Sequence, residues 1–265
     1  MADLFNPNVL TALGVCCMAA AATVVGSLIV VRGSHSSPRL LAFGLAFSGG
    51  AMVYVSLVEI FTKSVTSFSE TFSGQAAYTA ATLSFFAGIV LLGTIDRLIP
   101  NPHAGLDPDH PATEKARMHR VGLLTAAAIT AHNFPEGLAT FFATLDNPTV
   151  GASLAIAIGV HNIPEGVSIA VPVYYATGSK QKAIGAAAIS ALAEPTGAII
   201  GYLILAPFLS PAIFGAVFGV IAGVMVFLAL DSLMPEAKRY SSGHEATYGV
   251  IIGMGAMALS LVLFK

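Results

Sequence analysis

The chain has 265 residues, of which 55% are hydrophobic and only 10% are charged, whereas an ordinary soluble domain has about 25% charged residues. Together with a mean hydropathy of +0.80, this composition indicates an integral membrane protein built from apolar runs of about 20 residues. The net charge is -2, and the 12 lysines and arginines are spread over the loops, which excludes the basic patch that nucleic-acid binding requires.

Eight apolar runs are long enough to cross a membrane, and they predict an all-α integral membrane protein with eight transmembrane helices. Residues 1–7 contain no Lys or Arg and the first run is too long for a signal peptide, so we predict a retained span. This run contains Cys16 and Cys17, which we interpret as small apolar side chains of a helix. The predicted spans cover residues 8–31, 39–61, 76–96, 121–143, 149–176, 183–206, 212–235 and 246–264.

Lysine and arginine are distributed unequally between the two sides of this arrangement. Ten of the 12 lie in the loops of one side, and only Lys63 and Lys265 lie on the other. The positive-inside rule places the first side in the cytoplasm, so both termini are predicted on the outside.

The second span carries two candidate ligands at different depths. Met52, in the segment Ser-Gly-Gly-Ala-Met at 48–52, is placed near the middle of the membrane, and Glu59 lies near the outer end. Two interpretations of Glu59 stay open. It is either an entrance ligand that collects ions or an ordinary carboxylate close to the interface.

The loop between the third and fourth spans, about 98–120, is rich in proline and is predicted to be cytoplasmic. It carries His103, Asp107, Asp109, His110 and His119. Its composition favours a solvated linker, and the alternative is a segment that senses metal or helps to release it.

The most informative pattern is His-Asn-x-Pro-Glu-Gly, which occurs at 132–137 and again at 161–166. Residues four apart lie on one face of a helix, so the histidine and glutamate of each copy share a face. Two imidazoles and two carboxylates converge if the two helices pack together, and this set suits a borderline divalent cation. The four candidate ligands are His132, Glu136, His161 and Glu165.

Each copy of the motif also contains a proline and an asparagine. Pro135 and Pro164 each remove one backbone hydrogen bond, so we expect each helix to bend beside its ligands. In hydrocarbon such breaks are tolerated where neighbouring groups, ions or water satisfy the freed carbonyl. Asn133 and Asn162 either turn toward a second ion or satisfy the carbonyls that the prolines free.

The two motifs are predicted to lie at the same depth. His132 falls about 11 residues into its span, or roughly 16 Å into a core about 30 Å thick, and His161 falls at a similar level from the other side. Inverted repeats around a midplane site are a recurrent transporter arrangement. Glu194 adds a third carboxylate at this level, and three such groups cost on the order of 10 kcal/mol, so a cation should compensate them.

The paired motif on consecutive spans, the eight spans and the outside termini resemble the Zrt/Irt-like (ZIP) metal transporters, most closely their bacterial zinc-uptake branch called ZupT. The resemblance covers the whole chain. It implies a single transmembrane transporter domain over 1–265, with inverted 3+2+3 repeats and a midplane site that holds up to two metals. The ligands that it implies are His132, Asn133, Glu136, His161, Asn162, Glu165 and Glu194, with Met52 beside them.

The same resemblance implies the activity and the surroundings. The expected function is uptake of Zn²⁺, and also of Fe²⁺, manganese, cobalt or cadmium, across a bacterial inner membrane into the cytoplasm. No catalytic cofactor is expected, the lipid bilayer surrounds the chain, and a homodimer is the expected assembly. The loop lacks the long histidine tracts of some family members.

Two other functions remain as alternatives. One is a membrane-embedded metalloenzyme, although the chain has no His-Glu-x-x-His segment and its His-x-x-x-Glu spacing differs from the Glu-x-x-His of di-iron bundles. The other is a transporter of another solute that contains structural metal ions.

Overall fold

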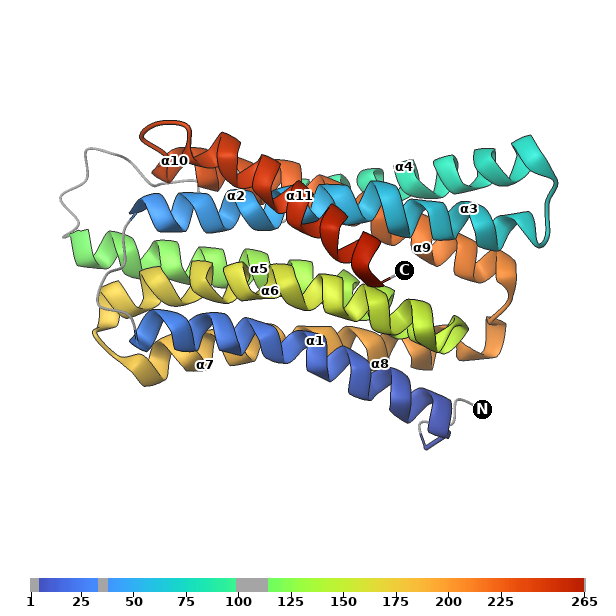
Figure 1. Ribbon diagram of the computed structural model, residues 1–265, viewed down its shortest axis with the longest axis horizontal. Coiled ribbons are helices and arrows are strands. Elements are labelled where there is room, and N and C mark those ends of the chain that lie inside the picture. Colours follow the sequence, from blue (N-terminus) through green and yellow to red (C-terminus); the bar gives the residue numbers. More distant parts are fainter. Residues whose placement is uncertain (1–4, 33–37, 99–113, 265) are drawn as a thin grey trace.

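The computed structural model of the protein describes residues 5–32, 38–98 and 114–264, and within these ranges every regular element is a helix (Figure 1). The α-helices are α1 (Pro7–Arg32), α2 (Pro38–Val55), α3 (Phe61–Ser69), α4 (Gly74–Leu98), α5 (Glu114–Asp146), α6 (Pro148–Thr177), α7 (Lys180–Ala191), α8 (Ala193–Leu205), α9 (Pro211–Leu228), α10 (Met234–Tyr240) and α11 (Glu245–Phe264). Two π-helical turns, η1 (Ser56–Ile60) and η3 (Ala229–Leu233), and one 3-10 turn, η2 (Ala206–Phe208), complete the elements.

The predicted fold class is confirmed. Seven helical segments of the described part are long and apolar enough to cross a membrane, and α5 is a further long helix at the place of the fourth predicted span. Because α5 begins at Glu114, residues 114–120 of the predicted loop are helical. His103, Asp107, Asp109 and His110 of that loop lie outside the described residues, as does the side chain of His119. Helix α1 begins and α11 ends toward the same end of the bundle (Figure 1), as an even number of spans requires.

Three predicted spans are interrupted. The second consists of α2, η1 and α3, and the seventh consists of α9, η3 and α10. The sixth is divided into α7 and α8 at Leu192, where Pro195 has no N–H to donate to the carbonyl of Ala191. Such interruptions are frequent at functional sites because they redirect side chains within a helix.

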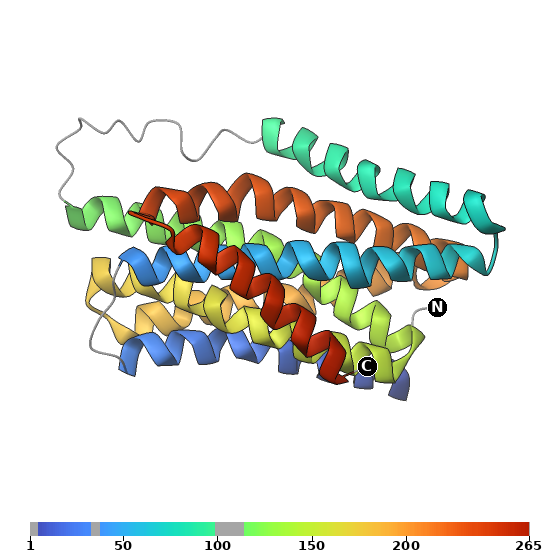
Figure 2. The ribbon, with the colours of Figure 1, turned by 45° about the horizontal axis from the view of Figure 1, so that its top comes forward.

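The helices form two groups. In one, α1 packs on α6 and α7, and α5 packs on α6 and α8. In the other, α2 packs on α11, and α9 packs on α3 and α4. Helices α3, α4 and α9 lie together on one side of the molecule (Figure 2). We call these the first and the second bundle. The main contact between them is that of α2 with α6, supported by α5 with α9 and α6 with α11.

Two close backbone contacts repeat each other inside the first bundle. Gly137 of α5 lies against the backbone of Glu194 in α8, and Gly166 of α6 lies against the backbone of Thr23 in α1. Each glycine is the last residue of its motif. A β-carbon at either position would overlap the opposing carbonyl group. The pair α5–α8 is therefore built like the pair α6–α1.

A second repeated contact lies in the second bundle. Gly50 of α2 lies against Val250 of α11, and Gly223 of α9 lies against Phe85 of α4. The π turn begins six residues after the glycine in both cases, η1 after Gly50 and η3 after Gly223. These matched contacts support the predicted inverted arrangement of spans 1–3 and 6–8 around spans 4 and 5.

The glycine contacts give a test of the packing. Replacing Gly166 with Ala should push α1 away from α6 and destabilise the folded protein by roughly 1–3 kcal/mol, the usual cost of overpacking. Gly185 of α7 is a matched control, because a β-carbon there meets no atom within 4 Å. Thermal unfolding of the purified proteins in detergent should show a lower midpoint for G166A than for G185A, and equal midpoints would contradict the close approach.

Candidate metal centre

Three buried side chains from α5 and α6 bring their ligand atoms together. Glu136, His161 and Glu165 are each 0% exposed, and one ligand atom from each lies within 4.8 Å of the others. His161 and Glu165 share a face of α6, and Glu136 comes from α5, which packs along α6. Imidazole nitrogen and carboxylate oxygen at this spacing suit zinc and similar divalent ions.

The histidine of one motif contacts the glutamate of the other. Nε2 of His161 lies 3.0 Å from Oε1 of Glu136. Ser48 of α2 donates a hydrogen bond to the backbone carbonyl of His161 at 3.4 Å, which connects the second bundle to the site. The two motifs therefore form one site and not two.

Glu194 of α8 joins the site through Asn162. The Nδ2 atom of Asn162 donates to Oε1 of Glu194 at 2.7 Å and to the backbone carbonyl of Ala19 in α1 at 3.0 Å. Its Oδ1 atom has no hydrogen-bond partner among the described residues. Since the nitrogen is already used, Oδ1 is the atom that Asn162 can offer to a cation.

Asn133 makes the corresponding contact on the other side of the site. Its Nδ2 atom donates to the backbone carbonyl of Ser190 in α7 at 3.0 Å, and its Oδ1 atom also has no partner in the described part of the chain. Both amides thus donate to neighbouring helices, whereas Pro135 and Pro164 free the carbonyls of Ala131 and Val160 in their own helices. Helices α5 and α6 continue through these prolines.

The carboxylates have few partners within the protein. One oxygen of Glu136, one of Glu194 and both of Glu165 have no hydrogen-bond partner among the described residues. None of the ion pairs formed by described lysines and arginines includes these three groups. A buried ionised carboxylate without a partner is costly, so the converging oxygens favour a cation between them.

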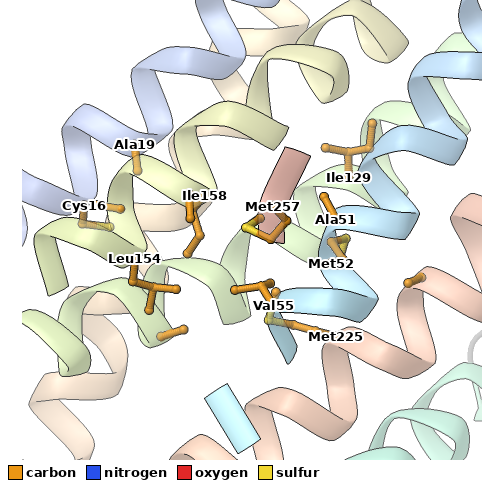
Figure 3. Close-up of a cluster of buried hydrophobic side chains, with 14 of the residues drawn as sticks. Cys16, Ala19, Ala51, Met52, Val55, Ile129, Leu154, Ile158, Met225 and Met257 are labelled. Carbon is orange, nitrogen blue, oxygen red and sulfur yellow. The ribbon is translucent and has the colours of Figure 1, made fainter. Parts of the chain in front are cut away.

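The remaining predicted ligands are not among the three converging side chains or lie outside the described residues. Met52 is fully buried in an apolar cluster with Met225 and Met257 (Figure 3). Glu59, which is 7% exposed, is part of η1. The backbone of His132 belongs to α5, but its side chain is outside the described residues. Cys16 is buried and Cys17 exposed, and neither forms a disulfide.

Sequence reasoning missed two residues, one that contacts this centre and one that belongs to the apolar cluster of Met52. Ser48 belongs to the same segment as Met52, but nothing in the sequence indicates its hydrogen bond to α6. Met225 lies in a uniformly apolar run and gave no signal. It follows Gly223 by two residues just as Met52 follows Gly50, so the repeated contacts identify it as the counterpart of Met52.

Comparison with known proteins identifies the family. A family model described as the ZIP zinc transporter matches residues 101–261. The whole chain is 60% identical to the zinc transporter ZupT of Xanthomonas campestris pv. campestris, of which 98% is covered, and 58% identical to that of Neisseria meningitidis serogroup B, of which 99% is covered. Over 97% of the chain and 98% of the relative, it is 46% identical to the zinc transporter ZupT of Chlorobium limicola. The chain belongs to the ZIP family.

Family membership confirms the predicted class of protein. This ZIP protein is a multi-pass membrane transporter and not an enzyme, which removes the alternative of a membrane-embedded metalloenzyme. The region that the family model matches contains both motifs and Glu194.

Asn162 provides a test of the site geometry. In Asn162→Ala the protein loses the donor to Glu194 and Ala19 and one candidate ligand oxygen, so zinc affinity should fall roughly 10- to 100-fold. Asn147 is the control, because its side chain accepts hydrogen bonds from the backbone N–H groups of Thr149 and Val150 at the start of α6. N147A should cost about 1 kcal/mol of stability and leave affinity unchanged. Titration calorimetry of the purified proteins measures both affinities, and equal values for N162A and wild type would contradict the assignment.

Proposed function

We propose that this ZIP transporter moves divalent metal cations across the membrane, with zinc as the main substrate. The observation that carries the proposal is the convergence of Glu136, His161 and Glu165 within 4.8 Å at a buried site. The names of the curated relatives, which are zinc transporters at 46–60% identity, support zinc. The further ligands that we propose are His132, Asn133, Asn162 and Glu194, with Met52 near the site and Glu59 at the entrance.

The donor set is large enough for two ions. Glu136 and Glu165 can each bridge a pair of cations, while the asparagine Oδ1 atoms and Glu194 supply further oxygens around them. Mixed nitrogen and oxygen ligands without thiolate discriminate weakly among divalent metals. Iron, manganese, cobalt and cadmium are therefore proposed as additional substrates.

The direction that we propose is uptake into the cytoplasm. The excess of Lys and Arg in the loops of one side supports a cytoplasmic location for these loops and an outside location for both termini. In a bacterial cell this corresponds to the inner membrane with periplasmic ends.

Transport requires the site to open to each side in turn. Glu136, Glu165 and Glu194 all belong to the first bundle, and the second bundle contacts the site through Ser48 of α2. Movement of one bundle against the other is a recurrent solution in transporters with inverted repeats. Lys63 of α3 and Asp146 of α5 form an ion pair between the bundles at 3.8 Å, and this pair has to break when the bundles separate at that end.

We propose that the lipid bilayer surrounds the exposed apolar residues, such as Leu83, Phe86 and Val90 of α4. A homodimer remains a prediction from the family resemblance.

A transporter of another solute with structural metal ions is the rival function. Flux separates the two, because a structural ion is bound without being moved. Sealed proteoliposomes should accumulate zinc, and they should be offered iron, manganese and cadmium in turn with and without a pH gradient. Static binding without accumulation would favour the rival.

The central ligand is tested by Glu136→Ala. This variant should reduce uptake of radioactive zinc to the background of cells without the transporter, because it removes a carboxylate that the site shares between both motifs. Glu236→Gln is the matched control, since Glu236 pairs with Arg239 in α10 at 3.7 Å and lies outside the site. With both variants present in the membrane at wild-type level, normal uptake by E136A would remove Glu136 from the site.

A further inference from the structure

Thr23 of α1 occupies an unusual position for a threonine in a membrane helix. Its side chain is 0% exposed, and its backbone carbonyl lies against Gly166, the residue next to Glu165. Helix α1 also packs on α5. Thr23 thus lies beside one helix of the metal site, in a helix that also packs on the other, although α1 contributes none of the predicted ligands.

Most described threonine hydroxyls are bonded to their own helix, whereas those of Thr23 and Thr140 are buried without a hydrogen-bond partner among the described residues. Threonines such as Thr62, Thr144 and Thr196 donate to the backbone carbonyl four residues earlier at 2.6–2.7 Å, which is the ordinary arrangement in a helix. For Thr23 that carbonyl belongs to Ala19, and it accepts from Nδ2 of Asn162 instead. Among the described residues Oγ1 of Thr23 has no hydrogen-bond partner.

The repeated contacts identify the counterpart of Thr23. The carbonyl of Thr23 meets Gly166 as the carbonyl of Glu194 meets Gly137. Four residues before Thr23, the carbonyl of Ala19 accepts from Asn162. Four residues before Glu194, the carbonyl of Ser190 accepts from Asn133. Thr23 therefore stands in the first half of the chain where Glu194 stands in the second.

This relation also indicates which group Thr23 faces. Glu194 reaches Asn162 with its carboxylate, so the same relation directs the side chain of Thr23 toward Asn133. The Oδ1 atom of Asn133 has no partner in the described part either. Because the threonine hydroxyl ends two bonds short of a glutamate carboxylate oxygen, it leaves room for a water molecule at a hydrogen-bond distance of roughly 2.8 Å between the two groups.

We propose that the hydroxyl of Thr23, together with Oδ1 of Asn133, binds a water molecule that the transported ion keeps, and so completes the half of the metal site opposite Glu194. The inference rests on the proposed metal transport and adds to it a residue of α1 that determines affinity. Thr23 then offers the site an uncharged hydroxyl at the position where its counterpart, Glu194, offers a carboxylate.

The test compares two conservative variants with a control. Thr23→Val keeps the shape of the side chain and removes the hydroxyl, so KM for zinc uptake into proteoliposomes should rise roughly 3- to 10-fold, the worth of one hydrogen bond, with little change in the maximal rate. Thr23→Ser keeps the hydroxyl and should stay within about twofold of wild type. Thr144→Val is the control, because Thr144 is 2% exposed and bonded to its own helix, and it should leave KM unchanged.

A third variant is expected to change zinc affinity in the opposite direction. Thr23→Glu places a fourth carboxylate at the site, so equilibrium binding of zinc should tighten by about 10-fold, because ligand charge sets affinity, while the rate of uptake falls. A wild-type KM for T23V, an equal rise for T23V and T23S, or unchanged zinc binding by T23E would each overturn the proposal. Failure of the proposed function itself is separate, since wild type would then accumulate no zinc.

Discussion

The central constraint on this structure is the unfavourable free energy of burying three carboxylates in an apolar interior. Glu136, Glu165 and Glu194 are each 0% exposed, and no described lysine or arginine is paired with them. Desolvation of such charges is unfavourable by several kcal/mol each, and hydrogen bonds such as that from Asn162 to Glu194 offset only part of this cost. A dication is the species that balances the remainder, so binding of the substrate and stability of the folded site are coupled.

The close approach of backbones holds these carboxylates in place. Gly137 and Gly166 let α8 and α1 come so near to α5 and α6 that a β-carbon would not fit, and membrane helices pack through such small residues. At this distance the asparagine amides reach the carbonyls of the neighbouring helices. These bonds hold the amide nitrogens, and the Oδ1 atoms have no hydrogen-bond partner among the described residues. Packing thus decides that the oxygen end of each amide is the end available to a cation.

Much of the site could be predicted from the sequence, because residues four apart in a helix share a face and the motif occurs twice. The spacing of His161 and Glu165, and the contribution of Glu136 from the adjacent span, follow from this rule. The π turns in the second and seventh spans could not be foreseen, since Ser56–Ile60 and Ala229–Leu233 share only a leucine at their second position. Nor could Thr23, because its resemblance to Glu194 lies in backbone contacts and not in residue type.

The inverted repeat is symmetric in its backbone and asymmetric in its charges. Gly137 and Gly166 have matching contacts, and both asparagines donate to a helix carbonyl at 3.0 Å, yet a glutamate on one side corresponds to a threonine on the other. With three carboxylates, one dication leaves a net charge of about -1 and two leave about +1, so neither state is fully neutral. A fourth carboxylate would neutralise two ions and hold them more firmly. A threonine in place of a fourth glutamate therefore keeps binding weak enough for the ions to be released.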